Sequence, residues 1–164
     1  MVRQVSDDDT SYRFPVLVAE EADTVDGTLS VRFKAISGRV DQAAGLVWRY
    51  LDENNYYVVR ANALEDNVVL YKIEKGKRSS LAPKGTPART YGVDQDVPAD
   101  QWNTLTVRFK GPLFTVWLDG TQLFQVEDQT FAQAGRVGLW TKADSVTAFD
   151  DLTLETEDSA EGSR

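Results

Sequence analysis

The fold class is decided by the stretch Thr104-Leu-Thr-Val-Arg-Phe-Lys-Gly-Pro-Leu-Phe-Thr-Val-Trp-Leu-Asp-Gly-Thr-Gln-Leu-Phe-Gln-Val-Glu127. Apolar and polar residues alternate from Leu105 to Phe109, with the period of two that is typical of a half-buried strand. Gly111-Pro112 breaks this pattern, and Leu113 to Leu118 resumes it. Asp119-Gly120 is a two-residue turn signal ahead of Gln122 to Glu127. The stretch therefore predicts a strand followed by a β-hairpin.

The same signs extend outward in both directions. They predict strands over residues 29–35, 46–51, 56–62, 67–73, 136–142 and 146–154. Residues 78–98 are predicted to be a long loop, and only residues 129–134 could hold a helical turn. A parallel sheet would need crossover helices, so the pattern indicates an all-β fold, an antiparallel β-sandwich or jelly roll. We expect a single domain over residues 1–164, with its core at about 13–154 and with a loose head (1–11) and tail (155–164).

Composition excludes several classes of chemistry. The chain has 164 residues and a formal net charge of −8, with no histidine and no cysteine. Nucleophile–imidazole couples, thiolate zinc sites and disulfides are therefore excluded. Duplex-binding surfaces need clustered basic residues in excess, so we expect no nucleic-acid partner. The longest apolar run is too short for a membrane helix, and we expect no membrane span and no signal peptide in this chain.

Folding the segment from Leu46 to Ile73 on its polar turns divides its side chains between two faces. One face carries Arg49, Tyr56, Arg60, Asn62, Asn67 and Tyr71, and the other carries Leu46, Trp48, Tyr50, Val59, Val68 and Leu70. Arginine and asparagine cannot share an apolar interior without partners. We therefore assign the second face to the core and the first to an accessible surface that suits a polar ligand. Val47, Val58 and Val69 fall on the first face and fit this assignment less well.

Two carboxylates, Glu65 and Asp144, are candidates for acid–base catalysis. Glu65 lies in a turn at the edge of the polar face, where ordinary turn chemistry is the alternative. Asp144 follows Lys142 at a strand end, where the pair could orient a sugar hydroxyl or form a surface ion pair. The sequence does not decide between these interpretations, so the catalytic residues stay unknown.

The segment Glu21-Ala-Asp23-Thr-Val-Asp26 is the one most similar to a glycosidase motif. On a strand, its first two carboxylates would share one face at the separation of about 5 to 5.5 Å that a retaining glycosidase uses. Because Asp26-Gly27 predicts a turn, we interpret the segment as a solvated loop.

Trp140 is the best aromatic candidate for a ligand platform. It alternates with Val137 and Leu139, so its ring faces away from them, and an aromatic face suits the C–H side of a sugar. Hard oxygen ligands occur at Asp94, Asp96 and Asp100 and at Asp150-Asp151, without the spacing of a calcium loop. We therefore expect no metal or other cofactor, with a structural calcium ion as the alternative.

The run from Gly45 to Asn62, Gly-Leu-Val-Trp-Arg-Tyr-Leu-Asp-Glu-Asn-Asn-Tyr-Tyr-Val-Val-Arg-Ala-Asn, resembles a signature of concanavalin A-like, laminin-G-type jelly rolls. Four later segments are similar to the same family's later strands, in the same order: Gln101 to Val107, Val116 to Gly120, Gly135 to Trp140 and Phe149 to Leu152. The resemblance is closest to bacterial 3-keto-disaccharide hydrolase domains, which are similar to family-16 glycoside hydrolases, and covers about residues 13–154.

This resemblance implies a domain that binds or hydrolyses a carbohydrate in an extracellular or periplasmic location. A non-catalytic structural or adhesive domain is the alternative, because this fold serves many functions. No Glu-x-Asp-x-x-Glu motif lies on a strand, so the family-16 mechanism is not carried over to any residue. Family members usually have further N-terminal strands, so we expect an exposed edge at Thr28–Ile36 or Val146–Leu154 and self-association through it.

Overall fold

The computed structural model describes residues 1–157. The strands of one sheet are β1 (Val2–Gln4), β3 (Gly27–Ser37), β9 (Trp102–Lys110), β10 (Leu113–Leu118), β11 (Thr121–Glu127) and β13 (Val146–Thr156). The strands of the other are β2 (Val16–Thr24), β4 (Ala43–Asp52), β5 (Asn55–Asn62), β6 (Asn67–Glu74), β7 (Lys77–Ser80), β8 (Val93–Asp94) and β12 (Gly135–Trp140).

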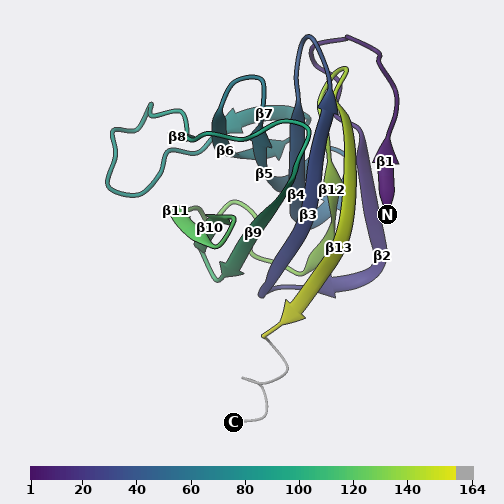
Figure 1. Ribbon diagram of the computed structural model, residues 1–164. Coiled ribbons are helices and arrows are strands. Elements are labelled where there is room, and N and C mark those ends of the chain that lie inside the picture. The colour runs from purple at the N-terminus through teal and green to yellow at the C-terminus, as the bar shows by residue number, and fades with distance from the viewer. Residues whose placement is uncertain (158–164) are drawn as a thin grey trace.

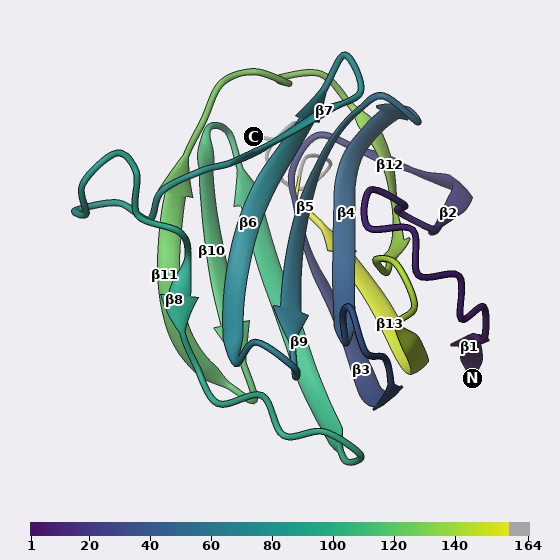
Figure 2. The same cartoon turned by 90° about the horizontal axis from the view of Figure 1, so that it is seen from above.

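These strands form two sheets that pack face to face (Figures 1 and 2). The six-stranded sheet has the order β1-β13-β3-β9-β10-β11. The seven-stranded sheet has the order β2-β12-β4-β5-β6-β7, and β8 pairs with β6. The pairs are antiparallel, from the outer pair β1 and β13 to the central pair β4 and β5. The predicted all-β antiparallel sandwich is confirmed, and residues 1–157 contain no helix that could cross a membrane.

All of the predicted strands are present, and four further strands within residues 1–157 were missed. The head contains β1, residues 21–24 of the acidic segment belong to β2, and the predicted loop 78–98 contains most of β7 and all of β8. Residues 129–134 form no helix. The tail is shorter than expected, because β13 continues to Thr156 and Glu157 pairs with Arg108 at 2.8 Å. The rest of the predicted tail lies outside the described residues.

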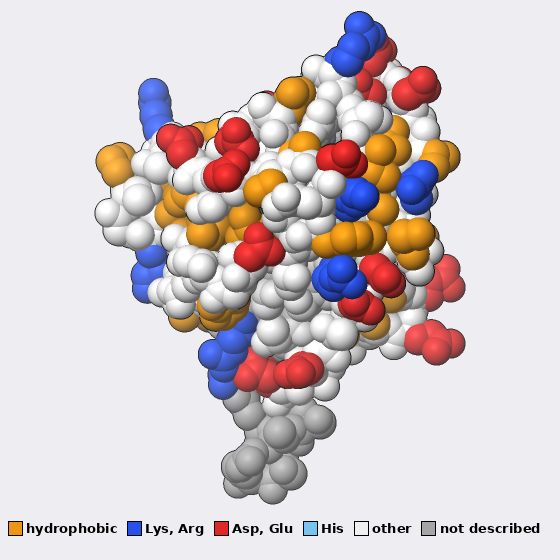
Figure 3. Space-filling model, in the orientation of Figure 1, with side chains coloured by type: hydrophobic (Ala, Val, Ile, Leu, Met, Phe, Trp, Pro, Cys, Tyr) orange, Lys and Arg blue, Asp and Glu red, His pale blue; other side chains and the backbone are white. Residues whose placement is uncertain are grey.

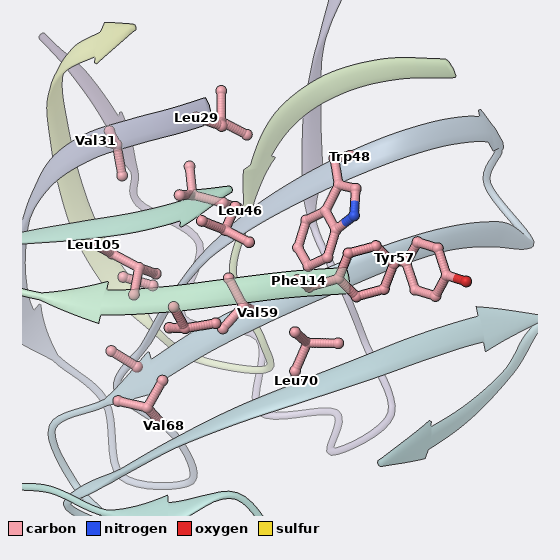
Figure 4. Packing of buried hydrophobic residues seen from close by; sticks show 14 of the residues in the cluster. Leu29, Val31, Leu46, Trp48, Tyr57, Val59, Val68, Leu70, Leu105 and Phe114 are labelled. Atoms are coloured by element: carbon pink, nitrogen blue, oxygen red, sulfur yellow. The ribbon is translucent and has the colours of Figure 1, made fainter. Parts of the chain in front are cut away.

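The core lies between the two sheets (Figure 4). Trp48 occupies its centre, with ring centroids 5.6 Å from Tyr57, 5.9 Å from Phe109 and 5.3 Å from Phe114. Five of the six residues assigned to the core from the sequence belong to this cluster, namely Leu46, Trp48, Val59, Val68 and Leu70. Burial of these apolar side chains is the main driving force that holds the sheets together.

A bulge in β4 reverses the expected alternation after Trp48. The pairing of β4 with β5 shifts between Trp48 and Asp52, and Arg49 has a φ of 47°. As a result Tyr50 packs against the cluster on the opposite side of the sheet from Trp48, so its assignment to the core was wrong. The Arg49 side chain likewise does not join Arg60 on the predicted polar face.

The expected exposed edge is present only in part. β3 is paired on both sides, with β13 and β9, so the expectation for Thr28–Ile36 was wrong. β13 pairs with β3 along most of its length and with β1 only at residues 147–149. An apolar groove of about 390 Å³ lies here, between β1, β2 and β13, and hydrophobic side chains gather near β1 in Figure 3. Self-association through this edge stays a prediction.

Candidate functional site

The face of the seven-stranded sheet that is turned away from the core carries its own cluster of buried side chains. We call this the outer face. Its buried residues are Ala43, Val47, Tyr56, Val58, Val69, Tyr71, Ile73 and Trp140, with Phe14, Val16 and Tyr50 packed against them. The valines that fitted the sequence assignment poorly therefore lie beneath aromatic side chains, and the sheet is buried on both of its faces.

Arg60 is the central charged group of the outer face. It is only 2% exposed, and its guanidinium donates hydrogen bonds to the carboxylate of Glu65 at 3.0 Å and to the hydroxyls of Tyr71 at 3.1 Å and Tyr91 at 3.2 Å. It also donates to the side-chain oxygen of Asn67. The Nε atom has no partner within residues 1–157. A buried guanidinium is tolerated here because four side chains solvate it.

Tyr71 and Tyr91 form a hydrogen-bonded path from the buried Arg60 to the surface. Burial raises the pKa of the Tyr71 hydroxyl, which is in hydrogen-bond contact with the hydroxyl of Tyr91. Tyr91 is 46% exposed. Its neighbour Gly92 has a φ of 58°, and a Cβ there would lie 2.2 Å from the carbonyl oxygen of Val68. This close approach holds the Tyr91 ring over the outer face.

Arg78 continues the line of aromatic and basic groups. Its guanidinium lies 4.5 Å from the ring centroid of Tyr71 and 5.3 Å from that of Phe14. The backbone N–H of Arg78 donates to the hydroxyl of Tyr12 at 2.8 Å. Polar and aromatic groups therefore extend from Arg60 to Tyr12 along one side of the outer face.

A segment before β2, residues 12–15, crosses the outer face, and we call it the strap. Backbone N–H groups of Thr141 and Ala143 donate to carbonyls of the strap at 3.0 and 2.9 Å. Phe14 stacks on Trp140, with ring centroids 5.3 Å apart. Trp140 is fully buried and donates from Nε1 to the hydroxyl of Tyr56 at 3.3 Å. Burial raises the pKa of Tyr56 to about 12. Trp140 is therefore covered, and the prediction that it is an accessible platform was wrong.

Charged residues also gather at the end of the outer face where β4 begins. Lys142 pairs with Asp41 at 2.5 Å, and the side-chain amide of Asn62 donates to Asp41 at 2.8 Å. The carboxylate of Asp144 accepts hydrogen bonds from the backbone N–H groups of residues 39, 40 and 41 at 2.7 to 3.1 Å. Burial raises the pKa of Asp144, but these bonds outweigh burial and the net pKa is lowered. Lys142 thus pairs with Asp41 rather than with Asp144.

Arg49 lies at the opposite end of the sandwich, away from the other predicted ligand-binding residues. It is 1% exposed and donates to the carbonyls of Val25 at 3.0 Å, Phe131 at 2.9 Å and Gly111 at 2.8 Å. It also contacts the carboxylate of Asp26 at 3.3 Å. Burial lowers the pKa of Arg49, and the charge of Asp26 opposes this shift. The contacts of Arg49 hold loops together.

The structure thus brings together four of the predicted residues, Arg60, Glu65, Asn67 and Tyr71. Asn62 and Lys142 belong to the charged group at one end, and Tyr56 and Trp140 lie under the strap. Arg60, Asn62, Tyr56 and Tyr71 are each at most 2% exposed, so the expected accessible surface is in fact buried. These residues share a face as predicted, but neighbouring segments cover them.

Sequence reasoning missed Tyr12, Phe14, Arg78 and Tyr91. Arg78 and Tyr91 fall in the predicted loop 78–98, and Tyr12 and Phe14 lie ahead of the first predicted strand, where no element was predicted. The aromatic residues in these polar segments were the available signal. Which strands those segments cross could not be deduced from local pattern.

The acidic residues considered for other roles have partners or lie apart. Asp151 pairs with Arg32 at 3.1 Å, and Asp150 lies 3.6 Å from the N-terminal amine. Within residues 1–157, no group of three acidic residues could hold a metal ion, and this includes Asp94, Asp96 and Asp100. Glu21 and Asp23 lie on β2 rather than in a loop.

Comparison with known proteins identifies the family. Residues 8–155 match the 3-keto-alpha-glucoside-1,2-lyase-like domain. The chain belongs to this family. No curated protein matches the chain in sequence. The resemblance to 3-keto-disaccharide hydrolase domains that the sequence motifs indicated is therefore confirmed. We call the chain the lyase-like domain below.

Solved structures show the same fold. The carbohydrate-binding module CBM66 from Bacillus subtilis is 22% identical, with a TM-score of 0.77 over 94% of this chain and 86% of that one. A putative glycosyl hydrolase from Parabacteroides distasonis is 17% identical, with a TM-score of 0.58 over 88% of this chain and 84% of that one. A tetrameric galectin from the sponge Cinachyrella is 16% identical, with a TM-score of 0.56 over 86% of this chain and 98% of that one. The lyase-like domain therefore has a jelly-roll fold that also occurs in lectins and hydrolases.

Proposed function

We propose that this domain binds a carbohydrate on its outer face, at the group formed by Arg60, Glu65, Asn67, Tyr71 and Tyr91. The observation that carries the proposal is the convergence of one guanidinium, one carboxylate and one amide beside a half-exposed tyrosine ring. Sugar hydroxyls both donate and accept hydrogen bonds, so they need donors and acceptors together, and the C–H face of the ring packs on an aromatic side chain. The names of the structural relatives, a carbohydrate-binding module and galectins, support the same class of ligand.

Binding is favoured over hydrolysis by the contacts of the two candidate carboxylates. The carboxylate of Asp144 accepts hydrogen bonds from three backbone N–H groups, and that of Glu65 pairs with Arg60 at 3.0 Å. A glycosidase needs two carboxyl groups that flank the scissile bond, one of which must be able to give up a proton. The contacts of Asp144 hold its pKa below the usual value, and both carboxylates already have partners within the protein.

The test is a titration of the protein with neutral oligosaccharides of glucose, galactose, xylose and fructose, followed by calorimetry on those that bind. Replacing Tyr91 by Ala removes the exposed ring, and we expect an affinity loss of about tenfold. Leu152→Ala, an exposed apolar truncation on β13, is the matched control and should leave the affinity unchanged. Absence of binding to every oligosaccharide of the panel would overturn the proposal.

The catalytic alternative has its own measurement. If the protein cleaves a glycoside or a 3-keto-glycoside, Glu65→Gln should lower the turnover by roughly 10²-fold or more, because a general acid or base typically contributes 10²–10⁴. Glu21→Gln on β2 is the matched control. Cleavage by the wild type together with that loss would replace the binding proposal by a hydrolytic or lyase function.

A further inference from the structure

A cavity of about 400 Å³ lies at the other end of the same line of aromatic groups. It is formed where the strap passes the β4–β5 turn and the β6–β7 turn, and its lining includes Tyr12, Phe14, Tyr50, Glu53 and Asn54. Its volume is within the range of about 300 to 1,000 Å³ that is usual for small-molecule sites. No residue of this cavity was singled out from the sequence as a ligand-binding residue.

The hydroxyl of Tyr12 accepts a hydrogen bond from the backbone N–H of Arg78, but three other polar side chains of the cavity form no hydrogen bond within the described residues. Within residues 1–157, no hydrogen bond involves the carboxylate of Glu53, the side-chain amide of Asn54 or the hydroxyl of Tyr50. Asn54 uses only its backbone, accepting from the N–H of Gly76 at 3.0 Å and donating to Asp52 at 2.8 Å. Three unpartnered polar groups therefore line one cavity.

The aromatic groups supply apolar surface beside these polar groups. Tyr12 is 57% exposed and its ring centroid lies 4.6 Å from that of Phe14. Tyr50 is half-buried against Tyr56, with centroids 5.2 Å apart. Rings that are held in place by neighbours offer flat surfaces at a small entropic penalty. This combination suits a ring-shaped ligand with hydroxyls at its edge and C–H groups on its faces.

We propose that this cavity binds one neutral pyranose ring and forms a second subsite of the carbohydrate-binding face. The Glu53 carboxylate accepts hydrogen bonds from two neighbouring hydroxyls, Asn54 both donates and accepts, and the rings of Tyr12 and Phe14 contact the sugar face. A uronic acid is disfavoured, because Glu53 and the net charge of −8 repel a second carboxylate. This inference rests on the proposed function and adds to it the position of a second subsite and a preference for uncharged sugars.

Arg78 joins the two subsites. Its guanidinium contacts Tyr71 on the Arg60 side and Phe14 on the cavity side, at 4.5 and 5.3 Å from the ring centroids. One oligosaccharide that runs along β6 and β7 can therefore contact both ends. The cavity then selects the sugar unit at one end of the chain.

The experiment uses the full chain and the oligosaccharide of the neutral panel that binds most tightly. Glu53→Gln removes the charge at constant size, and Asn54→Ala removes the amide while keeping the backbone bond to Gly76. We expect each variant to lose about tenfold in affinity, because Glu53→Gln weakens and Asn54→Ala removes hydrogen bonds to sugar hydroxyls. Glu21→Gln and Gln122→Ala, exposed positions on β2 and β11, are the matched controls and should bind like the wild type.

A second arm tests the charge preference. The same oligosaccharide with one terminal uronic acid should bind at least about tenfold more weakly to the wild type, and Glu53→Gln should reduce that difference. If the wild type binds but both cavity variants keep its affinity within twofold, the second subsite is wrong while the proposed function stands. If the wild type binds no oligosaccharide of the panel, the proposed function fails, and this inference fails with it.

Discussion

Trp48 and Trp140 are both fully buried, but they lie on opposite faces of the seven-stranded sheet and are covered in different ways. Trp48 is enclosed by rings from β5, β9 and β10, and its Nε1 atom has no partner within residues 1–157. Trp140 is covered by Phe14 of the strap and donates to the hydroxyl of Tyr56. The inner face is covered by a second sheet, whereas the outer face is covered by the strap and by the loop that carries Tyr91. The two faces of one sheet therefore differ in how firmly their coverings are built.

The largest losses in the free energy of unfolding are expected when the two tryptophans are replaced by alanine. Trp48→Ala should lower the free energy of unfolding by about 3–5 kcal/mol, because the rigid sheets cannot collapse into the cavity. Trp140→Ala should lower it by only about 2–3 kcal/mol, because the strap can move inward. Urea unfolding of both variants measures the two values. A larger loss for Trp140→Ala would mean that the strap is as rigid as a strand.

The contribution of Asp144, at the charged end of the outer face, to the free energy of unfolding should depend on pH. Its pKa is lowered in the folded state, so its contribution is complete above the pKa of the unfolded chain, about 3.9, and is lost as the pH falls through the lower folded value. We expect Asp144→Ala to lower the free energy of unfolding at pH 7 by roughly 3 kcal/mol, since three backbone donors lose a charged acceptor. The loss should shrink below pH 4, and an equal loss at pH 7 and pH 3 would contradict the assignment.

The strap is tested by Phe14→Ala. Because Phe14 is only partly buried, we expect a loss of about 1–2 kcal/mol in the free energy of unfolding. The variant should also uncover Trp140, which is measured as increased quenching of tryptophan fluorescence by acrylamide. The same substitution in a Trp140→Phe background is the control and should show no such increase. Unchanged quenching in the single variant would show that Trp140 is covered by more than Phe14.

The smallest effect is expected at Tyr91. Tyr91→Phe removes one hydroxyl that contacts Arg60 and Tyr71 but keeps the exposed ring. We expect a change of about 0.5–1 kcal/mol in the free energy of unfolding, because that side chain is nearly half exposed. Thermal unfolding measures it. A loss as large as that of Phe14→Ala would mean that the main role of the Tyr91 hydroxyl is to stabilise the outer face.

The sequence allowed the fold to be predicted wherever its signals are local. The turn at Asp119-Gly120 and the alternation around Leu105 define strands that the structure contains. The bulge at Arg49 depends on a distant residue, because a Cβ on Gly135 of the neighbouring strand would lie 2.4 Å from the Arg49 carbonyl carbon. The two segments fit only because residue 135 is glycine, and no pattern within β4 reports this contact.

The candidate site could be predicted only in part for the same reason. Arg60 and Asn67 share a face because strands alternate, and that inference needs no distant contact. Tyr91 reaches Arg60 through a loop whose path depends on how closely Gly92 approaches β6. Phe14 reaches Trp140 through backbone bonds of the strap with residues 141–143. Alternation predicts which side a residue faces but not what lies above it.

The position of Arg49 has a practical consequence for anyone who modifies this scaffold. One side chain joins the turn after β2, the turn between β9 and β10 and the connection from β11 to β12. Insertions or randomised libraries in any one of these connections will disturb the other two. At Gly85 a Cβ would meet nothing within 4 Å, and the neighbouring Lys84 bonds to one strand, β11, through the carbonyl of Gln125 at 2.7 Å and the carboxylate of Glu127 at 2.8 Å. This loop is therefore the better place to attach a tag or a second domain.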